Sequence, residues 1–286
     1  MKYRGLLILA VLMAASCFYL YRAEKTDTKD WLSTGISRFN AQTENGAITV
    51  LAQAAAGIEA DITRSCMGTS HAEAEKHLDD IVLSDSVGGS DVFLRADLPG
   101  ASARNYNCEF DVRTPAACAQ NLSTTNGAVT VNGISADVNL ETSNGAVTLS
   151  GVAGAIHAQT TNGAVTLTGT SGPAVVVTTN GQVTLAPHEG SIDARTSSGA
   201  IDCDLIRFDT FDTAVLHTSN GRVMVSLPSD VSVTFDAATS NGEVGVEGFT
   251  VNYTLNDHSH KRGSIGGGKA TLNIVTSNGQ VTIRPR

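Results

Sequence analysis

The sequence predicts an all-β protein: a parallel β-solenoid with rungs of about 18 residues, preceded by a β-rich N-terminal cap that contains one short helix. The first of three supporting observations is a corner dipeptide, Asn-Gly or Ser-Gly, that recurs every 18 residues, at Asn126, Asn144, Asn162, Asn180 and Ser198. Apolar residues also alternate on both sides of each corner, which is typical of strands with one buried face. A second glycine follows seven residues after the Asn, at Gly133, Gly151 and Gly169, so each unit holds two short strands and two corners.

The first 23 residues predict an export signal. Two basic residues precede an uncharged run from Gly5 to Tyr21, the order of a charged n-region and an apolar h-region. The segment AASC ends at Cys17 and resembles a bacterial lipobox, which makes Cys17 the predicted lipidation site. The alternatives are an uncleaved anchor, although the run is just short of a comfortable span, and simple cleavage. All three place the chain from residue 24 outside the cytoplasm, with residues 24–34 predicted as a linker.

The cap is predicted before the regular repeats. We expect residues 35–122 to hold the first repeat unit and the cap, and residues 123–286 to hold the solenoid repeats, within one domain. The segment SHAEAEKHLDDI predicts the short helix, because Ser70 and Glu73 form a capping box at its start. The segments DIVLSD, DVFLRADL and NCEFDVRTP around it predict strands. A cap is expected because the ends of a solenoid expose core residues and unpaired strand edges.

The repeat cassette extends beyond the corner dipeptide. Looser copies occur at Asn45, Asn220, Asn241 and Asn278. A threonine precedes the corner by two residues in all nine copies, at Thr43, Thr124, Thr142, Thr160, Thr178, Thr196, Thr218, Thr239 and Thr276. Stacked rungs bring equivalent residues together, which predicts a side-chain amide ladder of Asn126, Asn144, Asn162 and Asn180. The glycines after them, Gly127, Gly145, Gly163 and Gly181, are predicted to supply the positive φ of the corner.

A meander of hairpins is the alternative to the solenoid. Asn-Gly between alternating strands is also the strongest short-range signal for a two-residue hairpin turn. In a hairpin Leu140 faces Leu149, so the alternation alone does not separate the two folds. The constant period favours the solenoid, because only a coil stacked on itself must keep equivalent positions in register.

Four cysteines follow the export signal: Cys66, Cys108, Cys118 and Cys203. An even number in an oxidising compartment permits one or two disulfides. We predict a bond between Cys66 and Cys108, and buried free thiols are the alternative. The cysteines include no C-x2-C pair, which argues against a structural zinc site.

The exported chain is acidic and poor in aromatic residues. Residues 1–22 hold three of the 19 basic residues and none of the 28 acidic ones, so the remainder carries a formal charge of −12. Such a charge opposes nucleic acid or an anionic lipid surface as the main partner. Aromatic residues make up only 5%, which weakens any prediction of a sugar-stacking groove.

The segments that suggest chemistry have structural interpretations that fit better. GSIGGGKA at Gly263–Ala270 resembles a phosphate-binding loop, but an alanine replaces the required hydroxyl and a strand pattern follows. His258 and His260 lack further ligands at metal-site spacing. Scattered acids such as Asp193 and Asp202 form no column, which argues against a sugar-cleaving β-helix enzyme. We therefore expect no catalytic, cofactor-binding or metal-binding residue.

A column of threonines is predicted on the outside of the repeats, at Thr130, Thr148, Thr166 and Thr184. Regular threonine arrays on flat solenoids can bind ice. The column ends at Asp202, Met224 and Gly245, and threonine is in any case a good exposed strand residue. Ordinary strand surface is the better interpretation.

Three features together resemble a known family: the serial T-[ST]-N-G-x-V-x-[VIL] units, the segment NCEFDVRTPAACAQNLSTTNG, and the closing GSIGGGKATLNIVTSNGQVTI. The chain is similar to the bacterial "putative adhesin" β-solenoid domains of unknown function, relatives of auto-transporter adhesin head domains, from roughly Ser37 to Ile283. The resemblance implies a right-handed solenoid at the cell envelope, and it brings no catalytic residues.

We expect a non-enzymatic, adhesin-like envelope protein that presents a strand surface to an envelope protein or a surface glycan. The alternatives are an envelope-stress or scaffold component that binds other envelope proteins, and a polysaccharide-active β-helix enzyme. Contact with a membrane is expected only through the N-terminal anchor or lipid. Neither a cofactor nor nucleic acid is expected as a partner.

Overall fold

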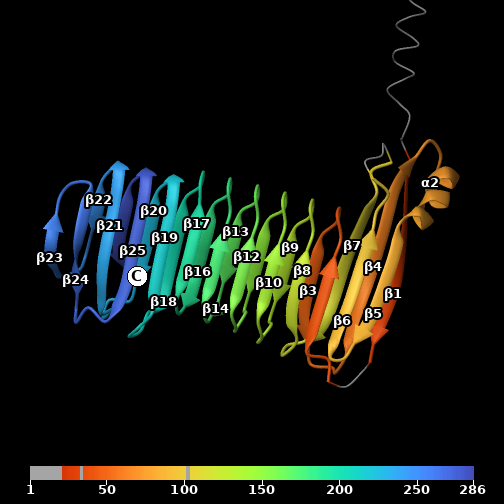
Figure 1. Cartoon of the computed structure of the whole chain (residues 1–286), viewed down its shortest axis with the longest axis horizontal. Coiled ribbons are helices and arrows are strands. Elements are labelled where there is room, and N and C mark those ends of the chain that lie inside the picture. Colours follow the sequence, from red (N-terminus) through yellow and green to blue (C-terminus); the bar gives the residue numbers. More distant parts are fainter. Residues whose placement is uncertain (1–20, 33–34, 101–103) are drawn as a thin grey trace, which may run out of the picture.

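The computed structural model describes residues 21–32, 35–100 and 104–286, and most of these residues form strands. Two 13-stranded sheets, named here sheet A and sheet B, run the length of the molecule (Figure 1). Their inward side chains form one hydrophobic core. The export signal up to residue 20 and the predicted lipidation site Cys17 lie outside the described residues.

Sheet A consists, in spatial order, of β1 (Tyr21–Trp31), β4 (Ile58–Gly68), β7 (Asn107–Pro115), β3 (Ile48–Gln53), β9 (Val129–Asn132), β11 (Val147–Ser150), β13 (Val165–Thr168), β16 (Val183–Glu189), β18 (Ile201–Arg207), β20 (Val223–Leu227), β26 (Val281–Pro285) and β22 (Val244–Val246), with β14 (Thr170–Ser171) beside β16. Sheet B consists of β23 (Val251–Asn256), β24 (His260–Ile265), β21 (Val233–Asn241), β25 (Ala270–Asn278), β19 (Thr213–Asn220), β17 (Ile192–Thr196), β15 (Ala174–Val177), β12 (Ile156–Gln159), β10 (Val138–Glu141), β8 (Ala119–Ser123), β2 (Arg38–Gln42), β6 (Asp91–Asp97) and β5 (Val82–Gly88). A short helix α2 (His71–His77) and a 3-10 turn η1 (Leu78–Asp80) complete the described part.

The regular part is a stack of parallel strands. Strand β11 pairs with β9 and β13, which places Val147 between Val129 and Val165. Strand β10 pairs with β8 and β12 in the other sheet. The two strands of one unit therefore belong to different sheets, and the hairpin meander does not hold. Along β11, Val147 and Leu149 are buried and Thr148 is exposed, as the alternation predicts.

The threonine of each cassette joins one rung to the next. All nine threonines are buried, and the Oγ1 of each donates to a main-chain carbonyl of the neighbouring rung. Thr160 donates to the Gly145 carbonyl at 3.0 Å, and Thr178 donates to Gly163 at 2.9 Å. A buried hydroxyl that repeats in this way satisfies a buried carbonyl at every corner, which explains why threonine recurs there.

The corner glycines are required for a different reason than the sequence predicts. None of Gly127, Gly145, Gly163 and Gly181 has a left-handed φ. A Cβ at Gly163 would lie 1.8 Å from the carbonyl oxygen of Gly145, so the rungs approach too closely for any side chain. The positive φ occurs at the opposite corner instead, for example 60° at Gly151.

The asparagine side chains of successive corners form an amide ladder. Asn144 Nδ2 donates to Asn126 Oδ1, Asn162 to Asn144, and Asn180 to Asn162, each at 2.7 Å. Asn126 Nδ2 continues the ladder to Asn45 Oδ1 at 2.6 Å. Asn126, Asn144 and Asn162 thus each donate to one neighbour and accept from the other, and the ladder extends over five rungs.

The linker prediction for residues 24–34 is wrong, because most of that segment belongs to β1. This strand pairs antiparallel with β4 along its whole length, and Ala23 and Trp31 are buried. The segment EKTDTKD between them alternates charged residues with threonine and has little apolar pattern. Charges of this kind suit an edge strand, where they discourage pairing with another chain.

The cap closes the N-terminal end of both sheets. Helix α2 packs against β1 and β4, beyond the last regular rung (Figure 1). The helix begins with the predicted N-cap residue, since the Glu73 amide donates to Ser70 Oγ at 3.2 Å. The Glu73 carboxylate accepts from the Thr69 amide and pairs with Arg104 at 2.8 Å. The hydrogen bonds from Thr69 and Arg104 lower the pKa of Glu73 to about 2.

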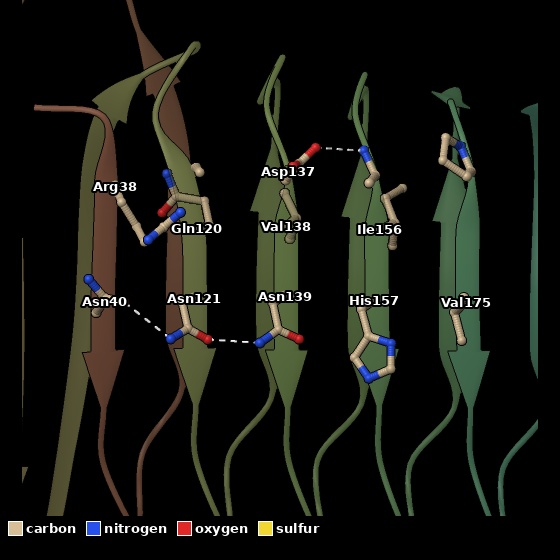
Figure 2. Close-up of a pocket in the computed structure, with 13 residues that line it drawn as sticks. Arg38, Asn40, Gln120, Asn121, Asp137, Val138, Asn139, Ile156, His157 and Val175 are labelled. Atoms are coloured by element: carbon tan, nitrogen blue, oxygen red, sulfur yellow. Dashed lines mark hydrogen bonds between the residues drawn. The ribbon is translucent and has the colours of Figure 1, made fainter. Parts of the chain in front are cut away.

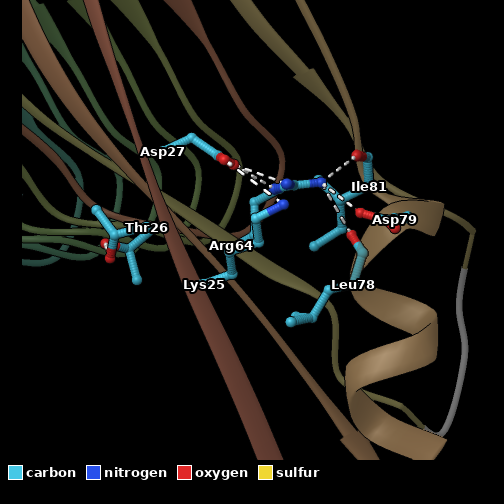
Figure 3. A network of polar contacts seen from close by, with 8 residues as sticks. Lys25, Thr26, Asp27, Arg64, Leu78, Asp79 and Ile81 are labelled. Carbon is cyan, nitrogen blue, oxygen red and sulfur yellow. Dashed lines mark hydrogen bonds and ion pairs between the residues drawn. The ribbon is translucent and has the colours of Figure 1, made fainter.

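Arg64 ties the turn after α2 to the sheet (Figure 3). Its side chain is only 9% exposed. Nε and Nη2 donate to Asp27 Oδ2 at 3.0 and 2.7 Å, while Nη1 donates to the carbonyls of Leu78 and Ile81 at 3.3 and 3.4 Å. One guanidinium therefore connects β1, β4 and the turn η1, and it satisfies two carbonyls at the end of the helical segment.

The C-terminal end departs from sequence order. Strand β25 lies between β19 and β21, and β26 lies between β20 and β22. The last cassette in the sequence is therefore not the last rung in space. Asn278 Nδ2 donates to Asn220 Oδ1 and Asn241 Nδ2 donates to Asn278 Oδ1, both at 2.9 Å, so the amide ladder follows the spatial order.

The predicted disulfide between Cys66 and Cys108 is not formed, because all four described cysteines are free and buried. Cys108 lies opposite Arg64 in the register of β4 and β7, so the two thiols are not directly across from each other. Cys66 Sγ instead donates to the Ala74 carbonyl of α2. Burial raises the pKa of Cys108 to about 12, which keeps that thiol protonated and unreactive at neutral pH.

Candidate functional site

The outer face of sheet B carries a row of varied side chains. The row consists of the residues that stand opposite one another in the strand register, which are, starting at the cap, Phe93, Asn40, Asn121, Asn139, His157, Val175, Asp193, Val215, Asn273, Asp236 and Arg262. We call these residues the sheet B row. Outside the cap, the members up to Asp236 lie five residues before the Asn or Ser of the corner in their own repeat.

This row was not predicted from the sequence. The signal was present, because the row follows from the cassette once the corner is aligned. It was overlooked because its members differ in chemistry, whereas the cassette residues are nearly identical. Which strands stand side by side is known only from the register, and the register places Phe93 of the cap beside Asn40 of the first rung.

The cap-side half of the row lines a shallow groove (Figure 2). The hollow has a volume of about 550 Å³ and crosses β2, β8, β10, β12 and the start of β15. Short side chains such as Ala119 and Ala155 line it beside the amides and the imidazole, and their size leaves this room. The groove crosses successive strands, so it has the shape for an extended ligand that lies across the rungs.

Three amides form the floor of the groove. Asn121 Nδ2 donates to Asn40 Oδ1 at 3.1 Å, and Asn139 Nδ2 donates to Asn121 Oδ1 at 2.9 Å (Figure 2). Asn40 Nδ2 donates to the Val92 carbonyl at 3.1 Å. An amide can make about four hydrogen bonds, so each retains donor or acceptor capacity for a ligand. His157 stands next in the row, and its ring has no hydrogen-bond partner in the described part of the chain.

A second hollow of about 510 Å³ extends the groove toward the cap. It shares Asn40 and Asn121 with the first hollow, so the two are continuous. Phe93 contributes a ring that is 44% exposed, beside Gln42 and Arg95. An exposed ring next to amides offers a ligand one apolar contact and several hydrogen bonds.

The charges around the groove are largely neutralised. Arg95 Nε donates to Asp97 Oδ1 at 2.6 Å, and Arg38 lies 3.5 Å from Asp91. Asp137 Oδ1 accepts from the Ala155 amide at 3.0 Å (Figure 2). The groove therefore presents neutral hydrogen-bonding groups rather than a charged patch, and it suits a neutral polar ligand.

The outer face of sheet A carries the predicted threonine column. The register aligns Thr49, Thr130, Thr148, Thr166 and Thr184, followed by Asp202, Met224, Thr282 and Gly245. The column is therefore real, and it breaks at the positions that the sequence indicates. Its groups are chemically uniform, in contrast to the sheet B row.

The segments with apparent chemical motifs have structural roles. The segment Gly263–Ala270 forms the end of β24 and the turn into β25, and a strand follows it rather than a helix. His260 Nε2 lies 2.7 Å from Asp236 Oδ1, and Arg262 pairs with the same carboxylate at 2.6 Å. In the part of the chain that the structure describes, no cluster of three or more His, Cys, Asp or Glu side chains is arranged to hold a metal ion. The same residues include no helix long and apolar enough to span a bilayer.

Comparisons with solved structures returned proteins with adhesion-related names. A "putative adhesin" from Bacteroides fragilis NCTC 9343 is 15% identical over 92% of this chain and 97% of its own, with a TM-score of 0.45. A "putative cell adhesion protein" from Clostridium sporogenes ATCC 15579 is 14% identical over 92% of this chain and 100% of its own, with a TM-score of 0.33. A "putative adhesin" from Parabacteroides distasonis ATCC 8503 is 9% identical over 90% and 97%, with a TM-score of 0.34. The comparison with curated proteins gave no match.

A family model gives firmer ground than these distant likenesses. The model described as Toastrack DUF4097 matches residues 109–284, which is more than half of the chain. The match begins in β7 and continues through the regular rungs to β26. The chain belongs to the Toastrack DUF4097 family.

Proposed function

We propose that this protein is a non-enzymatic, adhesin-like component of the bacterial cell envelope that binds a neutral surface glycan along the sheet B row. The observation that supports this best is the continuous groove floored by Asn40, Asn121 and Asn139. Amides and an imidazole match the hydroxyl groups of a sugar, and Phe93 offers a ring for its apolar face. The formal charge of −12 on the exported chain disfavours polyanionic ligands.

The fold proposed to carry this surface is a right-handed coil with rungs of about 18 residues. The ladder bonds between residues 18 apart, such as Asn162 to Asn144, support the rung length. Right-handed crossovers between parallel strands of one sheet are by far the commoner hand, which supports the handedness.

The proposed location is the outer side of a bacterial membrane, with the chain held by its N-terminus. Cys17 lies four residues before β1 begins at Tyr21, so a lipid on that cysteine would hold the cap close to the bilayer. Metabolic labelling with a palmitate analogue tests this, with Cys17→Ser as the matched variant. Label that is lost in the variant supports a lipoprotein, whereas an unlabelled, membrane-bound chain supports an uncleaved anchor.

A glycan array probed with the exported protein tests the binding surface. Asn139→Ala removes one ladder contact, the donation to Asn121 Oδ1, together with the unused hydrogen-bonding capacity of that amide, and His157→Ala removes the imidazole. Each should weaken binding roughly three- to tenfold, the value of one hydrogen bond. Thr148→Ala on the opposite face is the matched control and should bind as the parent does. If binding survives both changes on sheet B, the sheet B row is not the binding surface. If no glycan on the array binds, the proposal of a glycan ligand is wrong.

A second candidate function is that of a scaffold for other envelope proteins. The edge strand β5 supports it, because among the described strands it pairs only with β6, and it exposes Val82 at 57% and Val87 at 49%. Exposed edges of this kind accept a strand from a partner. Crosslinking on intact cells tests this function. Partner proteins should be captured through β5, and they should be lost when Ser84 is replaced by lysine and Ser86 by proline.

A further inference from the structure

The amide ladder has a chemical consequence for the corners. The described chain has nine Asn-Gly dipeptides: Asn45, Asn126, Asn132, Asn144, Asn162, Asn180, Asn220, Asn241 and Asn278 are each followed by glycine. Asn-Gly is the dipeptide most prone to deamidation, because glycine has no side chain to hinder attack by its own main-chain nitrogen. A protein with nine such sites depends on its fold to control them.

Deamidation proceeds in two balanced steps. The main-chain nitrogen of the glycine attacks Cγ of the asparagine, so a new N–Cγ bond forms. The Cγ–Nδ2 bond breaks, and Nδ2 leaves as ammonia with the proton that the glycine amide gives up. Water then adds to one carbonyl of the succinimide ring and opens it to aspartate or isoaspartate. No oxidant or other reactant is needed.

Six of the nine asparagines are clamped on both sides of the side-chain amide. In Asn144, Nδ2 donates to Asn126 while Oδ1 accepts from Asn162, both at 2.7 Å. The other clamped residues are Asn45, Asn126, Asn162, Asn220 and Asn278. Ring closure must swing Cγ toward the glycine nitrogen, which requires both bonds to break first. Each bond that must break first adds to the barrier and slows the reaction.

Two asparagines are clamped on one side only. Asn180 donates to Asn162, but the next rung has Ser198 in place of asparagine, and no described group donates to Asn180 Oδ1. Asn241 donates to Asn278 at the C-terminal end of the ladder, where no further rung follows. The glycine nitrogens that follow both, in Gly181 and Gly242, donate to no described acceptor. The same is true of the glycine nitrogens at enclosed corners such as Gly127, Gly145 and Gly163, so the open corners differ from these in the asparagine amide, which one bond fewer restrains.

Asn132 is protected by a different contact. Its side chain lies outside the ladder and is exposed, but the attacking nitrogen would be that of Gly133. That amide donates to the Ser150 carbonyl at 2.9 Å within the regular stack. Attack would require this main-chain bond to break, so here the fold restrains the nucleophile instead of the amide.

We propose that Asn180 and Asn241, the open ends of the amide ladder, are the sites where the folded protein deamidates, and that the ladder protects the other corners. Isoaspartate at position 180 would lengthen the main chain at a corner where rungs already touch. A Cβ on Gly181 would lie only 1.8 Å from the Gly163 carbonyl oxygen, so the stack has no room for the extra atom. Modification at Asn180 would thus open the solenoid near its middle.

Peptide mapping by mass spectrometry tests the proposal on the exported protein. The native protein and the urea-unfolded chain are incubated in the same mildly alkaline buffer, and the native rate at each site is divided by its unfolded rate. One extra hydrogen bond corresponds to roughly a fivefold difference in rate. The ratio at Asn180 and Asn241 should therefore exceed that at Asn126, Asn144 and Asn162 by about fivefold or more.

One substitution separates the ladder from general differences in mobility. Ser198→Asn restores the repeat and places an amide where it can donate to Asn180, so the ratio at Asn180 should fall about fivefold. Ser198→Thr keeps a hydroxyl and adds no amide, so the native-to-unfolded rate ratio at Asn180 should equal that of the unsubstituted protein. Equal ratios at the enclosed and open corners of the parent would overturn the proposal, as would an unchanged Asn180 rate in Ser198→Asn.

Discussion

Replacing Thr160 by valine tests what holds one rung to the next. Valine has the same branched shape, so the exchange removes the hydroxyl and leaves packing nearly unchanged. Thr160 is 2% exposed, and its Oγ1 donates to the Gly145 carbonyl at 3.0 Å. No other described group donates to that oxygen, so valine leaves a buried acceptor without a partner.

The expected loss follows from these contacts. A buried acceptor that loses its only donor costs about 1–3 kcal/mol. The new methyl group returns at most about 0.8 kcal/mol of apolar burial. The free energy of unfolding should therefore fall by roughly 0.2–2.2 kcal/mol, about 1 kcal/mol at the centre of that range, from the change at this single corner. Because the same contact recurs at every corner, it forms a substantial part of the rung-to-rung interaction.

Urea unfolding followed by circular dichroism measures the effect, provided that the slope with urea is unchanged. Thr148→Val on the outer face of sheet A is the matched control, and it should change stability by less than about 0.5 kcal/mol. Thr160→Ser keeps the hydroxyl and should lose only about 0.8 kcal/mol of methyl burial. If the valine variants at positions 160 and 148 unfold at the same urea concentration, the hydroxyl ladder contributes nothing and this reasoning fails.

Three further changes test other parts of the fold. Gly163→Ala puts a Cβ 1.8 Å from a main-chain oxygen and should prevent folding, whereas Gly169→Ala, with φ +60 and open space, should cost only about 1–2 kcal/mol. Thermal unfolding compares the two, and equal melting temperatures would contradict the close-approach argument. Arg64→Met takes the donor from the Leu78 and Ile81 carbonyls and, among the described residues, leaves Asp27 with only Lys25 at 3.7 Å, so it should cost about 3–5 kcal/mol and expose the α2 segment to protease. Burial lowers the pKa of His188 below its ordinary 6.5, so the unfolded chain binds the proton first and stability should fall as the pH drops below 6.5. Urea midpoints measured across this pH range should show that His188→Gln reduces the dependence of stability on pH. If that dependence is unchanged, other groups cause it.

Much of the regular fold follows from the period in the sequence. The period places Val129, Val147 and Val165 in one buried column, and the register shows them as partners. It predicts two strands and two corners per unit, which the structure has. The charged edge strand β1 could not be found in this way, because a strand that pairs on one side needs no apolar alternation.

The reasons for the cassette residues were beyond the sequence. Asn-Gly normally indicates a turn residue with a left-handed φ. At these corners glycine is required because a Cβ would collide with the carbonyl oxygen of the glycine in the neighbouring rung. The threonine hydroxyl likewise meets a carbonyl of another rung. Both contacts join residues that are far apart in the chain, so a local rule for turns cannot supply them.

The order of the last rungs could not be predicted because their cassettes are interchangeable. Thr-Ser-Asn-Gly occurs at the Asn220, Asn241 and Asn278 corners alike. The hairpin of β23 and β24 decides the order, since β24 pairs antiparallel with one edge of β21. The chain that returns from β24 finds only the other edge free, and β25 therefore enters between β21 and β19.

Antiparallel pairs thus close both sheets at the cap, β1 with β4 and β5 with β6, and β23 with β24 closes sheet B at the other end, where sheet A ends in the parallel strand β22. A parallel rung cannot extend sheet B past such an end in register, so the number of strands in sheet B is limited by its antiparallel ends rather than by the cassette. The length of the sheet B row is fixed with it. Since the cassette is nearly the same in every rung while the row changes from one rung to the next, selection of a ligand must come from the row, and substitutions in the cassette should alter stability before they alter binding.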